Sequence, residues 1–271
     1  MKNTHHDIPP ALAQALREAR RVVVFTGAGV SAESGIATFR DALTGLWSRF
    51  DAQALATPEA FREHPDIVWG WYEWRRAQVL RASPNAAHHA IAALSRHVPE
   101  LAVITQNVDD LHERAGSPQV THLHGSLHAP RCSRCGTPQS FPSGFPQEPD
   151  AGRRITPPAC TVCGAPVRPG VVWFGESLPA QAWRDATLAV QQCDLLFSIG
   201  TSSLVYPAAE LPQLAIAGGA KVVQINPAAT PLDALAHHNL RGAAAEVMPS
   251  LLAAAQFEPD APWADGRREV S

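Results

Sequence analysis

The 271-residue sequence has no apolar run close to the roughly 20 residues that a membrane-spanning helix needs, so we expect no transmembrane segment. Its start, MKNTHHDIPP, lacks the apolar core of a secretory signal, which favours a cytoplasmic location. An excess of positive charge is also missing: the formal net charge is -3, which argues against binding to nucleic acid or anionic membranes through bulk charge. Internal repeats are absent as well.

Cysteine is scarce, and its placement is informative. Four of the five cysteines form two C-x-x-C pairs, which indicates metal binding rather than disulfides. The fifth, Cys193, precedes an apolar run and is interpreted as a small buried hydrophobic residue. With 45% hydrophobic and 17% charged residues, the chain is typical of a globular protein with one large domain or a domain and a satellite.

Apolar runs alternate with helical patterns along most of the chain. This alternation predicts an α/β fold, namely a doubly wound, parallel, Rossmann-like sheet. The expected strands are 22–25, 101–105, 120–123, 195–199 and 222–225, and the expected helices are 11–20, 66–80, 86–96, 179–192 and 207–217. The aromatic cluster in the second helix is expected to pack a small helical satellite against the main sheet.

A glycine turn follows the first strand. Gly27-Ala28-Gly29 opens a G-x-G-x-x-A pattern, which is a permitted variant of the dinucleotide fingerprint. Glycines let the backbone approach a pyrophosphate, and free N–H groups at a helix start would face its negative charge. Small or hydrogen-bonding residues also follow the other strands: Gln106, Asn107 and Asp109; His124 and Gly125; Gly200, Thr201 and Ser202; and Asn226. Since ligands bind at the carboxyl ends of parallel strands, these residues predict one continuous polar cleft.

The composition changes between residues 130 and 171. Cys132 and Cys135 are separated from Cys160 and Cys163 by 24 residues, and a glycine follows each pair. Two such knuckles fit a tetrahedral, four-thiolate zinc site. Four sulfur ligands leave no position for a catalytic water, so we expect a structural zinc. The proline- and glycine-rich stretch between the pairs indicates an extended, mobile loop.

Several segments together resemble the sirtuins, the NAD-consuming protein deacylases. They are GAGVSAESGIATFR (27–40), TQNVDDLH (105–112), HLHG (122–125), VVWFGE (171–176), GTSS (200–203) and Asn226-Pro227. Ala37 departs from the family, in which proline is usual. The resemblance extends from about residue 15 to residue 252. It implies NAD as a consumed co-substrate, one structural zinc, acyl-lysine proteins or peptides as partners, and a monomer.

From this resemblance we expect a discontinuous Rossmann-like domain (11–40, 85–127 and 172–254), a helical insertion (41–84), a zinc module (128–171) and a disordered tail (255–271). The resemblance maps the catalytic base onto His124 and places Asn107 and Asp109 beside it. His122 and His124 would alternate faces of a strand, so that only one of them enters the cleft. The implied cofactor-binding residues are Gly27, Ala28, Gly29, Glu33, Ser34, Thr38, Phe39, Arg40, Gln106, Asn107, Asp109, Gly200, Thr201, Ser202, Asn226 and Ala244. For Glu33 and Asp110, a merely solvated or capping carboxylate remains an open alternative.

The implied reaction begins when the acyl-lysine oxygen attacks C1′ of the nicotinamide ribose and nicotinamide leaves. His124 then takes a proton from a ribose hydroxyl, which attacks the acyl carbon, and water releases lysine and O-acyl-ADP-ribose. Asp109 would favour the positive charge that develops near C1′. An extended peptide would add as a strand to the 171–176 segment by main-chain hydrogen bonds.

The acyl group is inferred from the expected helix 66–80. Tyr72 and Arg75 are at positions i and i+3 of this helix, so they share a face, but spacing alone favours the interpretation of Arg75 as one of a solvated Arg75-Arg76 pair. WYEWRR resembles the Y-x-x-R motif of the class III, desuccinylase branch, and Ala56 matches the alanine that widens its acyl pocket. The implied substrate-binding residues are Ala56, Tyr72, Arg75, Val172, Trp173 and Phe174, and the implied substrates are acetyl-, succinyl- or malonyl-lysine.

Three other functions remain open from the sequence. A nicotinamide oxidoreductase explains the glycine turn but not the QNVD segment or the zinc knuckles. A non-catalytic NAD or ADP-ribose sensor has no need of the base at His124. A mono-ADP-ribosyltransferase uses adjacent chemistry and would share most of these residues.

Overall fold

The computed structural model describes residues 6–37, 45–141 and 148–257. Three of the expected cofactor-binding residues, Thr38, Phe39 and Arg40, lie outside these ranges, as does most of the tail. Among the described helices, none is both long and apolar enough to cross a membrane.

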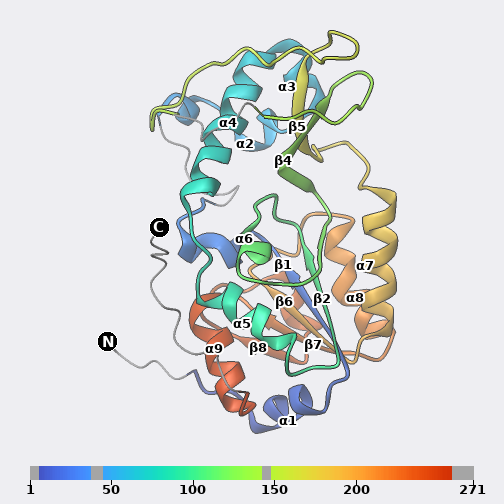
Figure 1. Cartoon of the computed structure of the whole chain (residues 1–271). Coiled ribbons are helices and arrows are strands. Elements are labelled where there is room, and N and C mark those ends of the chain that lie inside the picture. Colours follow the sequence, from blue (N-terminus) through green and yellow to red (C-terminus); the bar gives the residue numbers. More distant parts are fainter. Residues whose placement is uncertain (1–5, 38–44, 142–147, 258–271) are drawn as a thin grey trace, which may run out of the picture.

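A six-stranded, fully parallel sheet forms the larger part of the molecule (Figure 1). Its order is β3-β2-β1-β6-β7-β8, so successive strands are added first on one side of β1 and then, from β6 on, on its other side. The strands are β1 (Arg21–Thr26), β2 (Glu100–Thr105), β3 (Val120–His122), β6 (Leu195–Ile199), β7 (Lys221–Ile225) and β8 (His238–Leu240). The predicted α/β fold class is therefore confirmed, and β8 is a strand that the sequence analysis missed.

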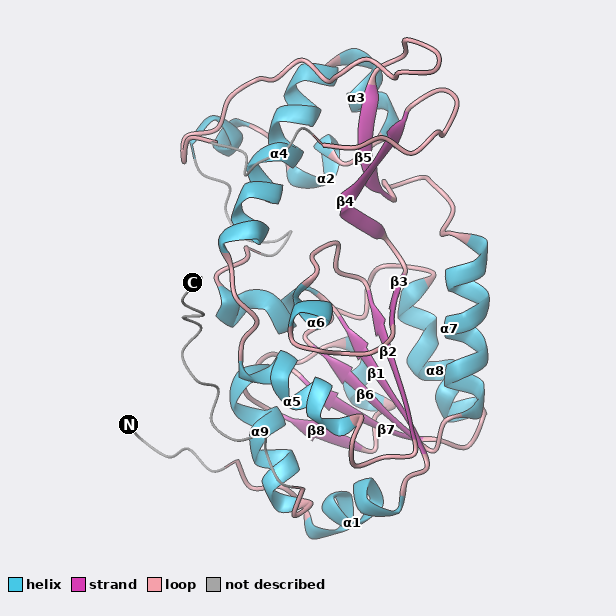
Figure 2. Ribbon diagram, in the orientation of Figure 1, coloured by secondary structure: helices cyan, strands magenta, loops and turns pink. Residues whose placement is uncertain are grey.

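Helices cover both faces of this sheet (Figure 2). One face is covered by α1 (Pro10–Glu18), α5 (Ala86–Leu94) and α9 (Ala244–Ala254), and the other by α7 (Ala180–Gln192) and α8 (Leu211–Ala217). Successive strand residues alternate between the two layers. Val22 and Val24 pack in the first core, while Val23 and Phe25 pack in the second. Cys193 is buried in the second core, as expected.

A smaller module lies beyond the carboxyl ends of the strands (Figures 1 and 2). It contains the helices α2 (Ala52–Leu55), α3 (Pro58–Glu63) and α4 (Pro65–Arg81) and the antiparallel pair β4 (Gly125–Cys132) and β5 (Val167–Val171). Short 3₁₀ helices η1 (Ala28–Ser34), η2 (Gly45–Arg49), η3 (Ala208–Glu210) and η4 (Pro231–Ala234) and the single turn α6 (Leu111–Arg114) complete the described elements.

One hydrophobic core joins the two insertions of this module. Trp47, Trp71 and Trp74 from the first insertion pack with Leu127 and Val171 from the second. The tryptophans therefore pack the helical satellite as predicted, but against the β4–β5 hairpin and not against the main sheet. The helical insertion and the zinc-bearing hairpin are therefore two halves of a single packed unit.

The proline- and glycine-rich stretch is partly fixed against α4. Ile155 N–H donates to the Asp66 carbonyl oxygen at 3.0 Å, and Trp74 Nε1 donates to the Asp150 carbonyl oxygen at 3.2 Å. A Cβ at Gly70 would lie 2.3 Å from the Arg153 carbonyl oxygen, so only glycine allows the stretch to lie this close to the helix. Its residues 148–155 therefore belong to the packed module.

Candidate active site

The glycine turn lies between β1 and β6, where the strand order reverses. A Cβ on Gly29 would lie 2.7 Å from Gly200 Cα, and Gly29 N–H donates to the Gly200 carbonyl oxygen at 2.8 Å. Gly27 N–H likewise donates to the Ile199 carbonyl oxygen at 3.0 Å. The expectation that these amides are free for a pyrophosphate is therefore wrong for Gly27 and Gly29. The glycines bring two loops together, and the helix that follows, η1, is 3₁₀ rather than α.

Three polar side chains meet directly above this turn. Ser31 Oγ donates to Asp109 Oδ2 at 3.0 Å and accepts from Asn107 Nδ2 at 3.1 Å. All three residues are buried. Burial raises the pKa of the Asp109 carboxyl above its ordinary value, although hydrogen bonds from Leu111 N–H and Ser31 act in the opposite direction. Ser31 orients both residues, and the sequence analysis did not identify it.

The candidate base, His124, follows β3 and precedes β4 in a turn. Its Nδ1 lies 3.0 Å from the Gln106 carbonyl oxygen, which can only accept, so Nδ1 carries a proton and Nε2 is the acceptor nitrogen. Burial lowers the pKa of His124, although the bond to Gln106 opposes that shift. Gln106 is held in turn by its side-chain N–H bond to Thr201 Oγ1 at 2.9 Å. The imidazole is therefore neutral and fixed.

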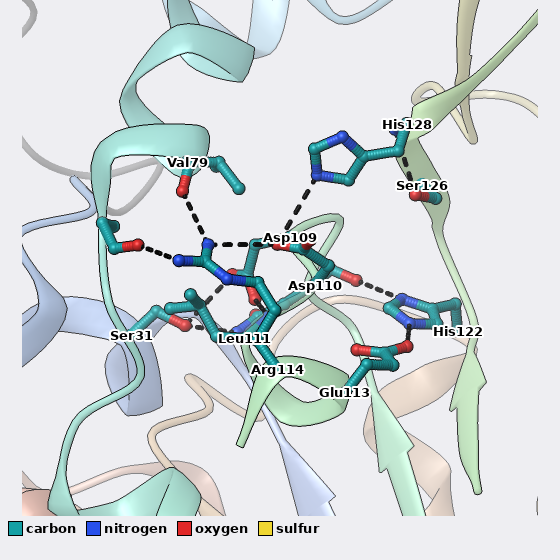
Figure 3. Close-up of polar contacts among 12 residues, drawn as sticks. Ser31, Val79, Asp109, Asp110, Leu111, Glu113, Arg114, His122, Ser126 and His128 are labelled. Atoms are coloured by element: carbon teal, nitrogen blue, oxygen red, sulfur yellow. Dashed lines mark hydrogen bonds and ion pairs between the residues drawn. The ribbon is translucent and has the colours of Figure 1, made fainter. Parts of the chain in front are cut away.

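His122 lies beside this site and bonds to the loop that carries Asn107. β3 ends at His122, so strand alternation does not extend to His124. His122 Nδ1 lies 3.0 Å from the Asn107 carbonyl oxygen, and Nε2 lies 2.6 Å from Glu113 Oε1 (Figure 3). Burial alone would lower the pKa of His122, but the bond and charge of Glu113 outweigh it, and the net shift is upward. Both ring nitrogens face acceptors, which fits an imidazolium.

Asp110, next to Asp109, contacts both α6 and strand β4 of the small module (Figure 3). Its Oδ1 lies 3.5 Å from Arg114 Nη1 and 3.6 Å from His128 Nε2. Arg114 also donates to the carbonyl oxygens of Val79, at 3.1 Å, and Ala82. Asp110 is therefore more than a solvated carboxylate, whereas Glu33 is exposed on η1.

The expected acyl-binding residues come together across the module. Trp173 Nε1 donates to Tyr72 Oη at 3.1 Å, and both side chains are buried. Burial raises the pKa of Tyr72 to about 12, so the phenol keeps its proton. Arg75 lies over the Trp71 ring, with Cζ 5.1 Å from the ring centre. Burial lowers the pKa of Arg75, and the charges of Tyr72 and Asp109 oppose that shift, which places Arg75 within electrostatic range of the Asp109 loop.

The segment expected to be the substrate-binding strand is a strand only at Val171, where β5 ends. Beyond it, the N–H groups of Val172 and Phe174 donate to the carbonyl oxygens of His124 and Ala56. Trp173 N–H donates to Glu176 Oε2, and all three bonds are 2.8–2.9 Å long. Through these bonds, the backbone of residues 172–174 holds the backbone of both Ala56 and His124. The N–H groups of Val172, Trp173 and Phe174 therefore already have partners within the chain.

The remaining predicted cofactor contacts lie around the ends of β6 and β7. Asn226 Nδ2 donates to the Thr201 carbonyl oxygen at 2.8 Å, and Ser34 Oγ accepts from Asn85 Nδ2 at 3.0 Å. Ala244 begins α9 and is buried. These residues lie on the same side of the sheet as the glycine turn, at the carboxyl ends of the strands.

The four cysteines of the two knuckles converge at the end of the β4–β5 pair. Their sulfur atoms all lie within 4.8 Å of one another, with separations of 3.4 Å for Cys132–Cys163 and 3.8 Å for Cys135–Cys160. This spacing and donor set fit a tetrahedral zinc. The cluster lies at the far end of β4 from His124, so a zinc held there supports the hairpin and not the reaction.

Comparison with known proteins gives a consistent result. A sequence profile of the Sir2 family matches residues 27–207. An NAD-dependent protein deacylase of Methylococcus capsulatus (strain Bath) is 64% identical over 243 residues, covering 90% of this chain and 95% of that protein. NAD-dependent protein deacylase 1 of Pseudomonas aeruginosa is 58% identical, covering 89% of this chain and 97% of that protein.

Solved structures agree over almost the whole length. A Sir2 homologue in complex with NAD aligns with a TM-score of 0.85 at 44% identity, covering 93% of this chain and 97% of that chain. A Sir2 protein bound to an acetylated peptide aligns with a TM-score of 0.80 at 31% identity, covering 92% and 98%.

Proposed function

The chain belongs to the Sir2 family and is an NAD-dependent protein deacylase, and from this premise we propose which residues carry the chemistry and which acyl groups it removes. His124 is the general base, and Tyr72 and Arg75 select acidic acyl groups such as succinyl or malonyl. The observation that carries this proposal is the assembly of Tyr72 with Trp173, which bonds to it, and with Trp71, whose ring Arg75 covers.

His124 takes the proton from a ribose hydroxyl of the NAD co-substrate. Its Nδ1–H is held by the Gln106 carbonyl oxygen, so Nε2 is the only ring nitrogen that can accept a proton. Burial lowers the pKa of His124, which keeps this nitrogen unprotonated at neutral pH. NAD supplies the ribose carbon that receives the acyl oxygen when nicotinamide leaves.

Asn107 and Asp109 hold the nicotinamide end of the co-substrate. Both side chains are fixed by Ser31 and are buried, which excludes water from the carbon at which positive charge develops. A fixed carboxylate near that carbon favours the transition state because it requires no reorganisation during the reaction.

Arg75 and Tyr72 bind the carboxylate at the far end of an acidic acyl group. A guanidinium and a phenol donor together form a charge-assisted hydrogen-bonding site for that carboxylate. An acetyl group has no such charge and would use the same base without this anchor. The names of the relatives give no support to an oxidoreductase, to a non-catalytic sensor or to an ADP-ribosyltransferase.

The proposal is tested by Arg75→Met. We expect kcat/KM for a succinyl-lysine peptide to fall because the activation free energy rises by roughly 2–5 kcal/mol. This is the usual loss when one partner of a buried charge pair is removed. Deacetylation of the matched acetyl peptide should fall far less or rise. Arg81→Met, at the more exposed end of the same helix, is the control and should leave the ratio of the two substrates unchanged. An equal loss for both peptides with Arg75→Met would show that Arg75 is structural and that the acidic preference is unfounded.

A further inference from the structure

The hydrogen bond between Trp173 and Tyr72 has a fixed direction. An indole N–H can only donate, so Tyr72 Oη must accept in this bond. The Tyr72 hydroxyl has a single hydrogen. Because Oη accepts a bond from Trp173, this hydrogen is directed away from the indole. Because burial raises the pKa of Tyr72 to about 12, the hydrogen remains on the oxygen at any working pH.

Trp173 is itself held on several sides. The Arg168 guanidinium lies over its ring, with Cζ 3.4 Å from the ring centre, and Phe61 packs 5.3 Å away between ring centres. Arg168 binds Glu176 through two parallel bonds of 2.6 and 2.8 Å and donates to the Val171 carbonyl oxygen at 3.0 Å. Glu176 also accepts from Trp173 N–H at 2.8 Å. The indole is therefore restrained both through its ring and through its backbone.

We propose that Trp173 is a specificity-determining positioning residue: it orients the Tyr72 hydroxyl as a donor toward an acidic acyl carboxylate, and the Arg168–Glu176 pair holds the indole in place. This inference rests on the proposed acidic-acyl selectivity and extends it. A phenol whose hydrogen could rotate freely would lose orientation entropy on binding a carboxylate, and the indole bond removes that loss before the substrate arrives. An acetyl group offers no acceptor at this point.

The direct test is Trp173→Phe, which keeps an aromatic ring over Arg168 but removes the N–H donor. We expect the ratio of kcat/KM for succinyl over acetyl peptides to fall about 5- to 10-fold, the size of one net neutral hydrogen bond. In a Tyr72→Phe background the same substitution should change the ratio by less than about twofold, because no hydroxyl remains to orient. A ratio that falls equally in both backgrounds would overturn the proposal, since the effect would then not pass through Tyr72.

A second replacement covers the case in which Trp173→Phe does not fold. Benzothienylalanine at position 173 has a sulfur atom in place of the indole N–H and nearly the same shape. It should lower the succinyl-to-acetyl ratio like phenylalanine, and an unchanged ratio would exclude the proposed orientation. Arg75→Met separates the two levels of the argument. If it leaves the ratio unchanged, the acidic selectivity itself fails; if it lowers the ratio while both Trp173 replacements do not, only the role of Trp173 fails.

Discussion

At the scale of single residues, His122 and His124 show how neighbouring histidines acquire opposite charge states. Partial burial lowers the pKa of His124 although its bond to the Gln106 carbonyl opposes that shift, whereas the Glu113 carboxylate raises the pKa of His122. The environment of His124 thus favours the neutral ring, and that of His122 favours the protonated ring. Environment, and not residue type, divides these roles.

This difference predicts the acid side of the pH profile. The base must be unprotonated, and burial lowers its pKa below the ordinary 6.5, so the decline of kcat/KM on the acid side should have its midpoint below pH 6.5. His124→Ala should lower kcat by about 10²-fold or more and leave NAD binding and the fold intact. Steady-state kinetics from pH 5 to 8 and calorimetric NAD titration would measure both effects. Turnover of the variant within a few-fold of the parent would show that another group is the base.

Some of the site residues could be predicted from the sequence and others could not. His124, Asn107 and Asp109 stand directly after apolar strands, and the fold brings such positions to one edge of the sheet. Ser31 and Glu113 give no comparable signal, because a serine in a glycine turn and a glutamate on a helical turn have many ordinary reasons to be there. Their importance comes from contacts with Asp109 and His122, which are distant in sequence.

At the scale of elements, Arg114 joins helix α4 to the segment that follows β2. It lies at the end of α6, which directly follows Asp109, and donates to carbonyl oxygens at the C-terminal end of α4 (Figure 3). The Val79 carbonyl oxygen also accepts from the Ala82 N–H at 3.2 Å, and a cation at this end of the helix complements the helix dipole. Arg114 therefore fixes the distance between the helix that carries Arg75 and the loop that carries Asp109.

We expect Arg114→Leu to destabilise the protein by about 1–2 kcal/mol, the range for losing hydrogen bonds from a partly exposed charged donor. Activity on succinyl and acetyl peptides should fall by similar factors, because both substrates need the helix and the loop in register. Chemical denaturation and kinetics with both peptides would measure these effects. A changed ratio of the two activities would instead show that Arg114 contacts the acyl group. Unchanged stability would show that the bonds from Arg114 to the end of α4 do not stabilise the fold.

The elements themselves were predictable to different degrees. β1, β2, β6 and β7 are continuous apolar runs, and α4 has clear boundaries, so these elements were predicted within one residue of their observed ends. β8 has only three residues, His-Asn-Leu, and forms because β7 offers it a free edge. The segment after β5 resembled a strand in sequence, but Glu176 and Ala56 take its N–H groups.

At the scale of the whole molecule, the zinc site secures the end of the small module. We expect elemental analysis to find one zinc per chain, held by the four thiolates. Cys160→Ser should lose the metal and lower the thermal unfolding midpoint of the small module, because much of the folding free energy of such a module comes from the metal. Cys193→Ser, at a buried cysteine outside the cluster, is the control and should keep its zinc. Zinc-free protein with unchanged unfolding would contradict a structural role.

The shared core of the small module has a consequence for how the protein is made. Tyr72 and Trp173 touch although they are 101 residues apart, and the strands β2 and β3 are synthesised between them. On the ribosome, α4 therefore emerges long before its partner residues and must wait with its tryptophans unburied until the second insertion has been translated. Such a delay exposes apolar surface to chaperones and to neighbouring nascent chains. Closing so long a loop is also slow compared with forming local contacts, so the contact between Tyr72 and Trp173 is a late event in the life of each new chain.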